Sequence, residues 1–199
     1  MIEKQSKKRR LYIQQDEEME MLKTKAIEGD DDSQIVLSFH YAFGMKVIIN
    51  IMESKEWCIK SSEKGNNLAL GMIKLNGWNE KQDNQMAINY FEKAIKEDIN
   101  CKRKDTSFAI FMMAFIYFNG IEMEQNYEKA FELFQKSSQL GNSNAMNNIA
   151  CMYEHGKGVD QNFELAYQYY TKVTILLFFI FFLNNFLKSS LAVWEIATR

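Results

Sequence analysis

The 199-residue sequence lacks proline entirely and contains only two histidines and three cysteines. Proline removes a backbone donor and breaks helices, so its absence alongside 12 methionines favours helical structure. The cysteines at 58, 101 and 151 are odd in number and widely spaced, which indicates free thiols in a reducing compartment. A formal net charge of −2 gives no reason to expect a nucleic-acid-binding surface. Apolar residues make up 47%, enough for a substantial core.

One short pattern occurs four times along the chain. A glycine precedes a small residue by ten positions in each occurrence, and the successive glycines are separated by 33, 43 and 36 residues. Periods of this size mark stacked supersecondary units. The four pairs are Gly44 and Ser54, Gly77 and Ala87, Gly120 and Ala130, and Gly156 and Ala166.

Each unit divides into two helical stretches, which we call its first and second helix. The first helix ends at the repeated glycine, because glycine adopts positive φ without steric cost. The second helix closes at a Gly-Asn junction, as at residues 65–66 and 141–142. Small residues at 54, 71, 87, 114, 130, 150 and 166 predict close approach of the helix backbones.

Two irregularities interrupt the repeat. The second unit reaches its glycine only 12 residues after Gly65, against 15 elsewhere, so we expect its first helix to be shorter by nearly a turn. About seven extra residues follow Ala94, in a charge-rich stretch that we expect to be exposed to solvent. The predicted organisation is a basic end at 1–11, a truncated leading unit at 12–32, four units at 33–66, 67–106, 107–142 and 143–172, and a tail at 173–199.

The spacing of these residues resembles the Sel-1-like repeat, a subclass of tetratricopeptide-like helical hairpins. The third unit has Glu122 in place of the second glycine, and the second unit has Lys74 in place of the tyrosine. The resemblance implies an all-α, right-handed α-solenoid of antiparallel helix pairs that acts as a non-enzymatic scaffold or adaptor. The fourth unit matches best, through Ala145, Ile149, Ala150, Tyr153, Gly156, Gly158, Val159, Asp160, Ala166, Tyr169, Tyr170 and Lys172.

Motifs that carry chemistry are missing. The sequence has no G-x-S-x-G, Walker or G-x-G-x-x-G element, and no His, Cys and carboxylate cluster with metal-ligand spacing. His155 directly precedes a repeat glycine and is expected to end a helix. Cys58 occupies a position where other units carry aromatic residues, so we expect it to be buried. We therefore predict no enzymatic activity, no cofactor and no metal; a hydrolase is a distant alternative.

A partner-binding face can be placed on the first helices. Positions 2, 6 and 9 after the initial small residue fall at about 200°, 240° and 180° on a helical wheel, opposite that small residue. Solenoids of this kind bind partners on the concave side, which the first helices usually line. The third unit is apolar all round from 108 to 118, so this helix is either buried by its neighbours or offers an apolar patch. The predicted contact residues are Ile35, Phe39, Phe111, Phe115, Phe118, Asn147 and Cys151.

The two ends of the chain depart from the repeat. Lysines and arginines within residues 4–10 lie beside an acidic run, and a solvated end is expected. After Lys172 the sequence is strongly apolar for 11 residues, or for 15 if Asn184 and Asn185 are included, while a membrane span needs about 20. Three interpretations of the tail stay open: a packed terminal helix, a membrane anchor at 173–187, and a segment that is not the natural continuation. We expect a cytoplasmic protein, with membrane association as the alternative.

Overall fold

The computed structural model describes residues 19–43, 47–78, 81–97, 104–120 and 123–175, and within these ranges it is all-α, with no strand. Helical stretches at 19–28 and 163–175 flank the labelled helices. The labelled helices are α2 (Asp31–Phe43), α3 (Ile51–Glu63), α4 (Asn67–Asn76), α5 (Asn84–Glu97), α6 (Lys104–Asn119), α7 (Tyr127–Gln139) and α8 (Ser143–His155).

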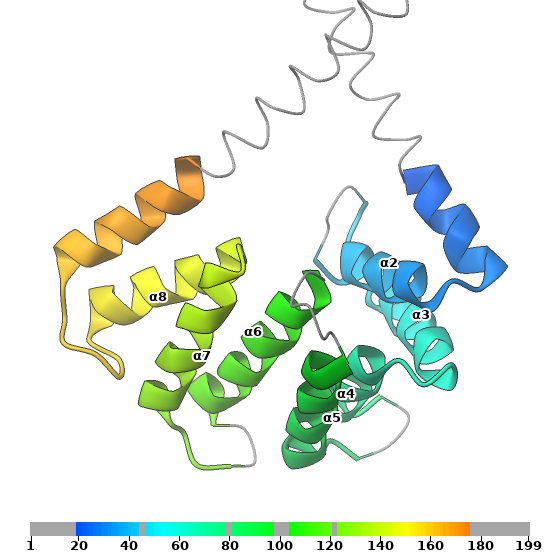
Figure 1. Cartoon of the computed structure of the whole chain (residues 1–199), viewed down its shortest axis with the longest axis horizontal. Helices are drawn as coiled ribbons and strands as arrows, with labels where there is room; N and C mark the ends of the chain where they lie inside the picture. Colours follow the sequence, from blue (N-terminus) through cyan, green and yellow to red (C-terminus); the bar gives the residue numbers. More distant parts are fainter. Residues whose placement is uncertain (1–18, 44–46, 79–80, 98–103, 121–122, 176–199) are drawn as a thin grey trace, which may run out of the picture.

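The helices form hairpins that stack along the chain. α2 packs on α3, α4 on α5 and α6 on α7, and further contacts join α3 to α4, α5 to α6 and α7 to α8. Figure 1 shows the hairpins following one another in a curved row, from residues 19–28 at one end to 163–175 at the other. The predicted all-α solenoid is confirmed.

The turn within each hairpin is built from backbone groups. Gly77, Gly120 and Gly156 have φ of 65°, 63° and 65°, the left-handed region that ends the first helix. The backbone N–H that begins the second helix then donates to a carbonyl near the end of the first helix. The four bonds are Asn50 to Tyr41 (2.9 Å), Asp83 to Lys74 (2.9 Å), Asn126 to Tyr117 (3.0 Å) and Asn162 to Tyr153 (2.8 Å). The acceptor is a main-chain carbonyl, so the bond does not depend on the side chain at that position. Lys74 therefore makes the same turn that a tyrosine makes in the other three units.

The junctions between hairpins also follow the predicted chemistry. Gly65 and Gly141 have φ of 84° and 87°. The asparagine after each glycine caps the next helix: Asn66 Oδ1 accepts from the N–H of Ala69, and Asn142 Oδ1 from that of Ala145, both at 3.1 Å. The Gly-Asn pair therefore ends one helix and starts the next within two residues.

The predicted small residues lie at the helix crossings. Ser54, Ala87, Ala130, Ala166, Ala114 and Ala150 are all buried, as is Gly71. At Gly71, an added Cβ would lie 2.4 Å from the ring of Phe91, closer than van der Waals contact allows. These positions confirm that small side chains lie where helices approach one another closely.

We expect the Ala130→Leu substitution to lower the free energy of unfolding by about 1–3 kcal/mol, because three further heavy atoms would enter a fully buried site. Urea denaturation followed by circular dichroism measures this change. The matched control is Gln139→Leu on the same helix, where the side chain is exposed. Equal stabilities of the two variants would show that Ala130 does not lie at a tight crossing.

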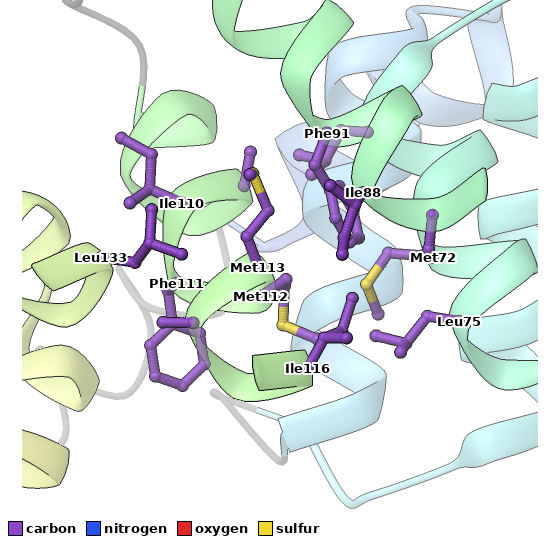
Figure 2. Packing of buried hydrophobic residues seen from close by; sticks show 14 of the residues in the cluster. Met72, Leu75, Ile88, Phe91, Ile110, Phe111, Met112, Met113, Ile116 and Leu133 are labelled. Atoms are coloured by element: carbon purple, nitrogen blue, oxygen red, sulfur yellow. The ribbon is translucent and has the colours of Figure 1, made fainter. Parts of the chain in front are cut away.

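The main hydrophobic core extends through the hairpins, with α6 at its centre, and a smaller cluster of Met19, Ala26 and Leu37 lies at the N-terminal end. α6 is apolar all round from 108 to 118, and seven of these apolar residues are buried: Ala109, Ile110, Phe111, Met112, Met113, Ala114 and Ile116. Figure 2 shows Leu133 of α7 on one side of α6, and Met72, Leu75, Ile88 and Phe91 of the preceding hairpin on the other. Burial by neighbouring units, one of the two alternatives for this helix, is the arrangement found over most of its length.

The structure describes the first irregularity fully and the second in part. α4 has 10 residues, against 13 in α2 and α8, which confirms the loss of nearly a turn. Of the charge-rich stretch after Ala94, Lys96 and Glu97 are exposed, and residues 98–103 lie outside the described residues. α6 begins at Lys104, so the predicted boundary between 106 and 107 falls inside the first turn of that helix.

Candidate partner-binding surface

Three of the seven predicted contact residues belong to the core. Ile35 is fully buried, and Phe39 and Phe111 are 7% and 9% exposed. The Phe39 ring lies 4.1 Å from that of Phe108, and the Phe111 ring 5.7 Å from that of Phe134, between centroids. A partner could reach these side chains only by displacing their neighbours.

The other four predicted residues are accessible to different degrees. Phe115 on α6 is 39% exposed, and Asn147 on α8 is exposed. Cys151 is half-buried, as is Phe118, whose ring packs edge-on against Tyr127 at 5.2 Å. The prediction of a partner contact therefore concerns mainly Phe115 of the third hairpin and Asn147 and Cys151 of the fourth.

Polar side chains join α8 to the helix at 163–175. The Tyr170 hydroxyl donates a hydrogen bond to Glu154 Oε2 at 2.9 Å. Desolvation and this bond to a carboxylate raise the pKa of Tyr170 to about 12. Within α8, Cys151 Sγ lies 3.6 Å from His155 Nδ1. The same ring nitrogen lies 2.9 Å from the carbonyl oxygen of Cys151. The Glu154–Tyr170 pair was not found from the sequence, because its members are 16 residues apart on different helices.

The thiols of Cys58 and Cys151 have different surroundings. Cys58 is fully buried, and its Sγ donates to the carbonyl of Ala69 at 3.5 Å. Burial raises the pKa of this thiol to about 12. The unfolded chain loses this proton at a lower pH than the folded protein does. The stabilisation of the folded state that results is therefore present below about pH 9 and is lost as the pH rises towards 12. The prediction that Cys58 is a buried small apolar residue is confirmed.

We expect Cys151 to react with a thiol reagent in the folded protein and Cys58 to react only on unfolding, because the thiolate is the nucleophile and needs solvent access. A Cys101→Ser background restricts the measurement to these two thiols. Mass spectrometry after alkylation at pH 8, with and without urea, identifies the modified residue. Rapid native alkylation of Cys58 would contradict its burial under α4.

Metal-ligating side chains do not cluster in the described residues. Within them, no group of three His, Cys, Asp or Glu side chains is placed to hold a metal ion. A recess of about 470 Å³ lies at the α4–α5 turn, but the Asp83 carboxylate there is engaged in capping α5, accepting from the Met86 N–H at 2.8 Å. The residues lining this recess are Lys74, Lys81, Gln82, Asp83, Asn84, Gln85 and Met123.

Comparison with family models identifies the repeat. The Sel1 repeat model matches residues 31–66, 67–98, 107–142 and 143–172, more than half of the chain. The chain belongs to the Sel1 repeat family. Sel1 repeat proteins are generally non-enzymatic scaffolds for protein interactions. No curated protein matches the chain.

Two solved structures are similar to this chain. A protective antigen of uropathogenic Escherichia coli that displays an SLR fold is 22% identical, with a TM-score of 0.50, and the match covers 78% of this chain and 32% of that protein. A Sel1 repeat protein from Oxalobacter formigenes is 22% identical, with a TM-score of 0.48 and coverage of 73% and 57%. The chain thus spans between about a third and somewhat over half of the length of these two relatives.

Within the described parts of this Sel1 repeat chain, no helix combines the length and apolar composition that crossing a bilayer requires. The proposed membrane anchor at 173–187 lies outside the described residues except for its first three positions.

Proposed function

We propose that this Sel1 repeat chain is a non-enzymatic adaptor that binds an extended peptide or a helical partner through the concave face of the solenoid. The observation that carries the proposal is the partial exposure of Phe115 on α6. Most of this helix is buried, and Phe115 is the large apolar side chain by which α6 reaches solvent. A partly exposed aromatic ring on a rigid helix is the type of side chain that contributes most to protein interfaces.

The fourth hairpin supplies polar groups of the kind that fix a bound segment. Asn147 is exposed on α8, and the Glu154 carboxylate accepts from Tyr170 on the neighbouring helix. Amide and carboxylate groups can pair with backbone N–H groups of a partner. The proposal therefore assigns an apolar anchor to the third hairpin and polar contacts to the fourth.

We expect the Phe115→Glu substitution to abolish capture of partners without loss of helical structure, because the site borders solvent. Affinity capture with quantitative mass spectrometry compares wild-type and variant baits. Lys136→Glu, an exposed charge change on α7, is the matched control and should retain the partners. Phe111→Glu is expected to unfold the protein instead, since that ring is buried. Equal partner sets for wild type and Phe115→Glu would reject the concave-face proposal.

We also propose a cytoplasmic location, with tethering to a membrane by residues 173–187 as the alternative suggested by their apolar sequence. Carbonate extraction of membranes separates the two. A cytoplasmic protein appears in the supernatant, whereas a tethered one pellets and becomes soluble when the chain is truncated after Lys172.

A further inference from the structure

The interface between α7 and the fourth hairpin shows how a second helix is covered in this solenoid. The Phe131 ring of α7 packs edge-on against Tyr153 of α8, with centroids 5.4 Å apart and planes at 85°. Lys157 Nζ lies 5.7 Å from the Tyr127 ring centroid. Gly158 lies so close to Tyr127 that an added Cβ would be 2.6 Å from its carbonyl carbon. α8 and the glycine loop after it therefore cover the outer face of α7.

The helix at 163–175 repeats this face 36 residues later, and among the described residues the aromatic side chains of the face stay exposed. Phe163 and Tyr167, which correspond to Tyr127 and Phe131, are 66% and 68% exposed, whereas their counterparts are half-buried. Tyr170 is 37% exposed, but its hydroxyl bonds to Glu154 of α8, so it lies towards its own hairpin, as its counterpart Phe134 lies towards α6. We call Phe163 and Tyr167 the terminal face. Two exposed aromatic side chains one turn apart on a helix form an apolar surface of the kind that marks an interaction site.

We infer that the terminal face binds the first helix of a Sel1-type hairpin contributed by another protein. The chemistry required follows from α8. Such a helix presents a small residue, an aliphatic residue four positions later and an aromatic residue after a further four, as Ala145, Ile149 and Tyr153 do. Its aromatic ring would pack on Tyr167 as Tyr153 packs on Phe131, and the solenoid would continue across the two proteins.

The sequence that follows the terminal face does not carry this pattern. In register with Gly141, Asn142, Ala145 and Tyr153, it has Leu177, Phe178, Phe181 and Ser189. The Gly-Asn junction, the small residue and the aromatic residue of a first helix are thus all replaced.

A second copy of the chain is also unsuited to supply the helix. The first complete unit of that copy begins with α2, and the side of α2 that faces the preceding unit is already covered. Leu37 is fully buried against Met19 and Ala26, and Gln34 Nε2 donates to the Ala26 carbonyl at 2.9 Å. Stacking α2 on the terminal face of another copy would require removal of residues 19–28. A partner with an uncovered first helix meets no such obstacle.

The test uses the full chain and a labelled peptide with the sequence of residues 142–159, stapled between positions 147 and 151. These positions lie opposite the side of α8 that carries Ala145 and Ile149, and the staple offsets the low helicity of a short peptide. Fluorescence anisotropy should show saturable binding. We expect Tyr167→Ala in the protein, or Tyr153→Ala in the peptide, to weaken binding about tenfold or more. Ile48→Ser, a substitution at another exposed apolar side chain, should leave binding unchanged.

Several results would overturn the inference. One is no binding at peptide concentrations up to about 1 mM, and another is binding that is insensitive to Tyr167→Ala. Slow alkylation of a Tyr167→Cys variant in the monomer would show that the chain covers its own terminal face. A dimer in light scattering that Tyr167→Ala dissociates would show that a second copy occupies it. Because Phe115→Glu should not affect peptide binding, failure here is distinguishable from failure of the concave-face proposal.

Discussion

Replacing Phe134 with alanine is expected to lower the free energy of unfolding by about 3–5 kcal/mol. This side chain is fully buried in α7, and its ring lies 5.7 Å from that of Phe111 and 6.2 Å from that of Phe118. Truncation would leave a cavity between α6 and α7, at the centre of the third hairpin. Urea denaturation monitored by circular dichroism gives the change directly.

The matched control for this substitution is Phe163→Ala. Phe163 also lies on a second helix but is 66% exposed, so its truncation should change the stability by no more than about 0.5 kcal/mol. If the two variants were equally stable, the buried position of Phe134 would be wrong, and with it the packing of α7 on α6.

Replacing Gly158 with alanine is expected to loosen the fourth hairpin from the third. Gly158 has φ of 67°, a conformation that costs an L-residue about 1–2 kcal/mol. The new Cβ would also lie 2.6 Å from the carbonyl carbon of Tyr127, and such overpacking costs about 1–3 kcal/mol. The two effects together predict a loss of about 2–5 kcal/mol. Hydrogen exchange should accelerate in α8 and at 163–175 more than in α2 and α3, because stability in a repeat array depends on neighbouring units.

Gly141→Ala separates the two effects. Gly141 has a similarly positive φ of 87°, but nothing lies within 4 Å of an added Cβ. This control should therefore show only the backbone cost of about 1–2 kcal/mol. Equal losses at 141 and 158 would mean that the loop of the fourth hairpin does not rest on Tyr127.

The features of the fold that depend on local chemistry could be predicted from the sequence. A glycine that must adopt positive φ ends a helix wherever it occurs, so Gly77, Gly120 and Gly156 placed three of the turns correctly. Asn66 and Asn142 likewise begin helices because their side chains cap them. The shortened α4 followed from counting residues between glycines. None of these predictions required knowledge of how the hairpins pack.

The candidate site was harder to predict because it depends on contacts between units. Phe39 lies opposite the small residue of its helix, where a concave-face side chain is expected, yet its ring is covered by Phe108 of the third hairpin. A helical wheel describes one helix and cannot report a neighbour two units away. In α6, an apolar side chain occurs at nearly every position, so the pattern does not distinguish the exposed Phe115 from the buried Phe111.

The central claim is that the hairpins share one continuous interior, and contacts between aromatic rings of different hairpins test it most directly. In a nuclear Overhauser experiment on the full chain with labelled Phe and Tyr, we expect cross-peaks between Phe39 and Phe108 and between Phe131 and Tyr153. These ring centroids are 4.1 and 5.4 Å apart and belong to different hairpins. Absence of both cross-peaks in a folded, helical sample would show that the hairpins do not stack, and would contradict the account.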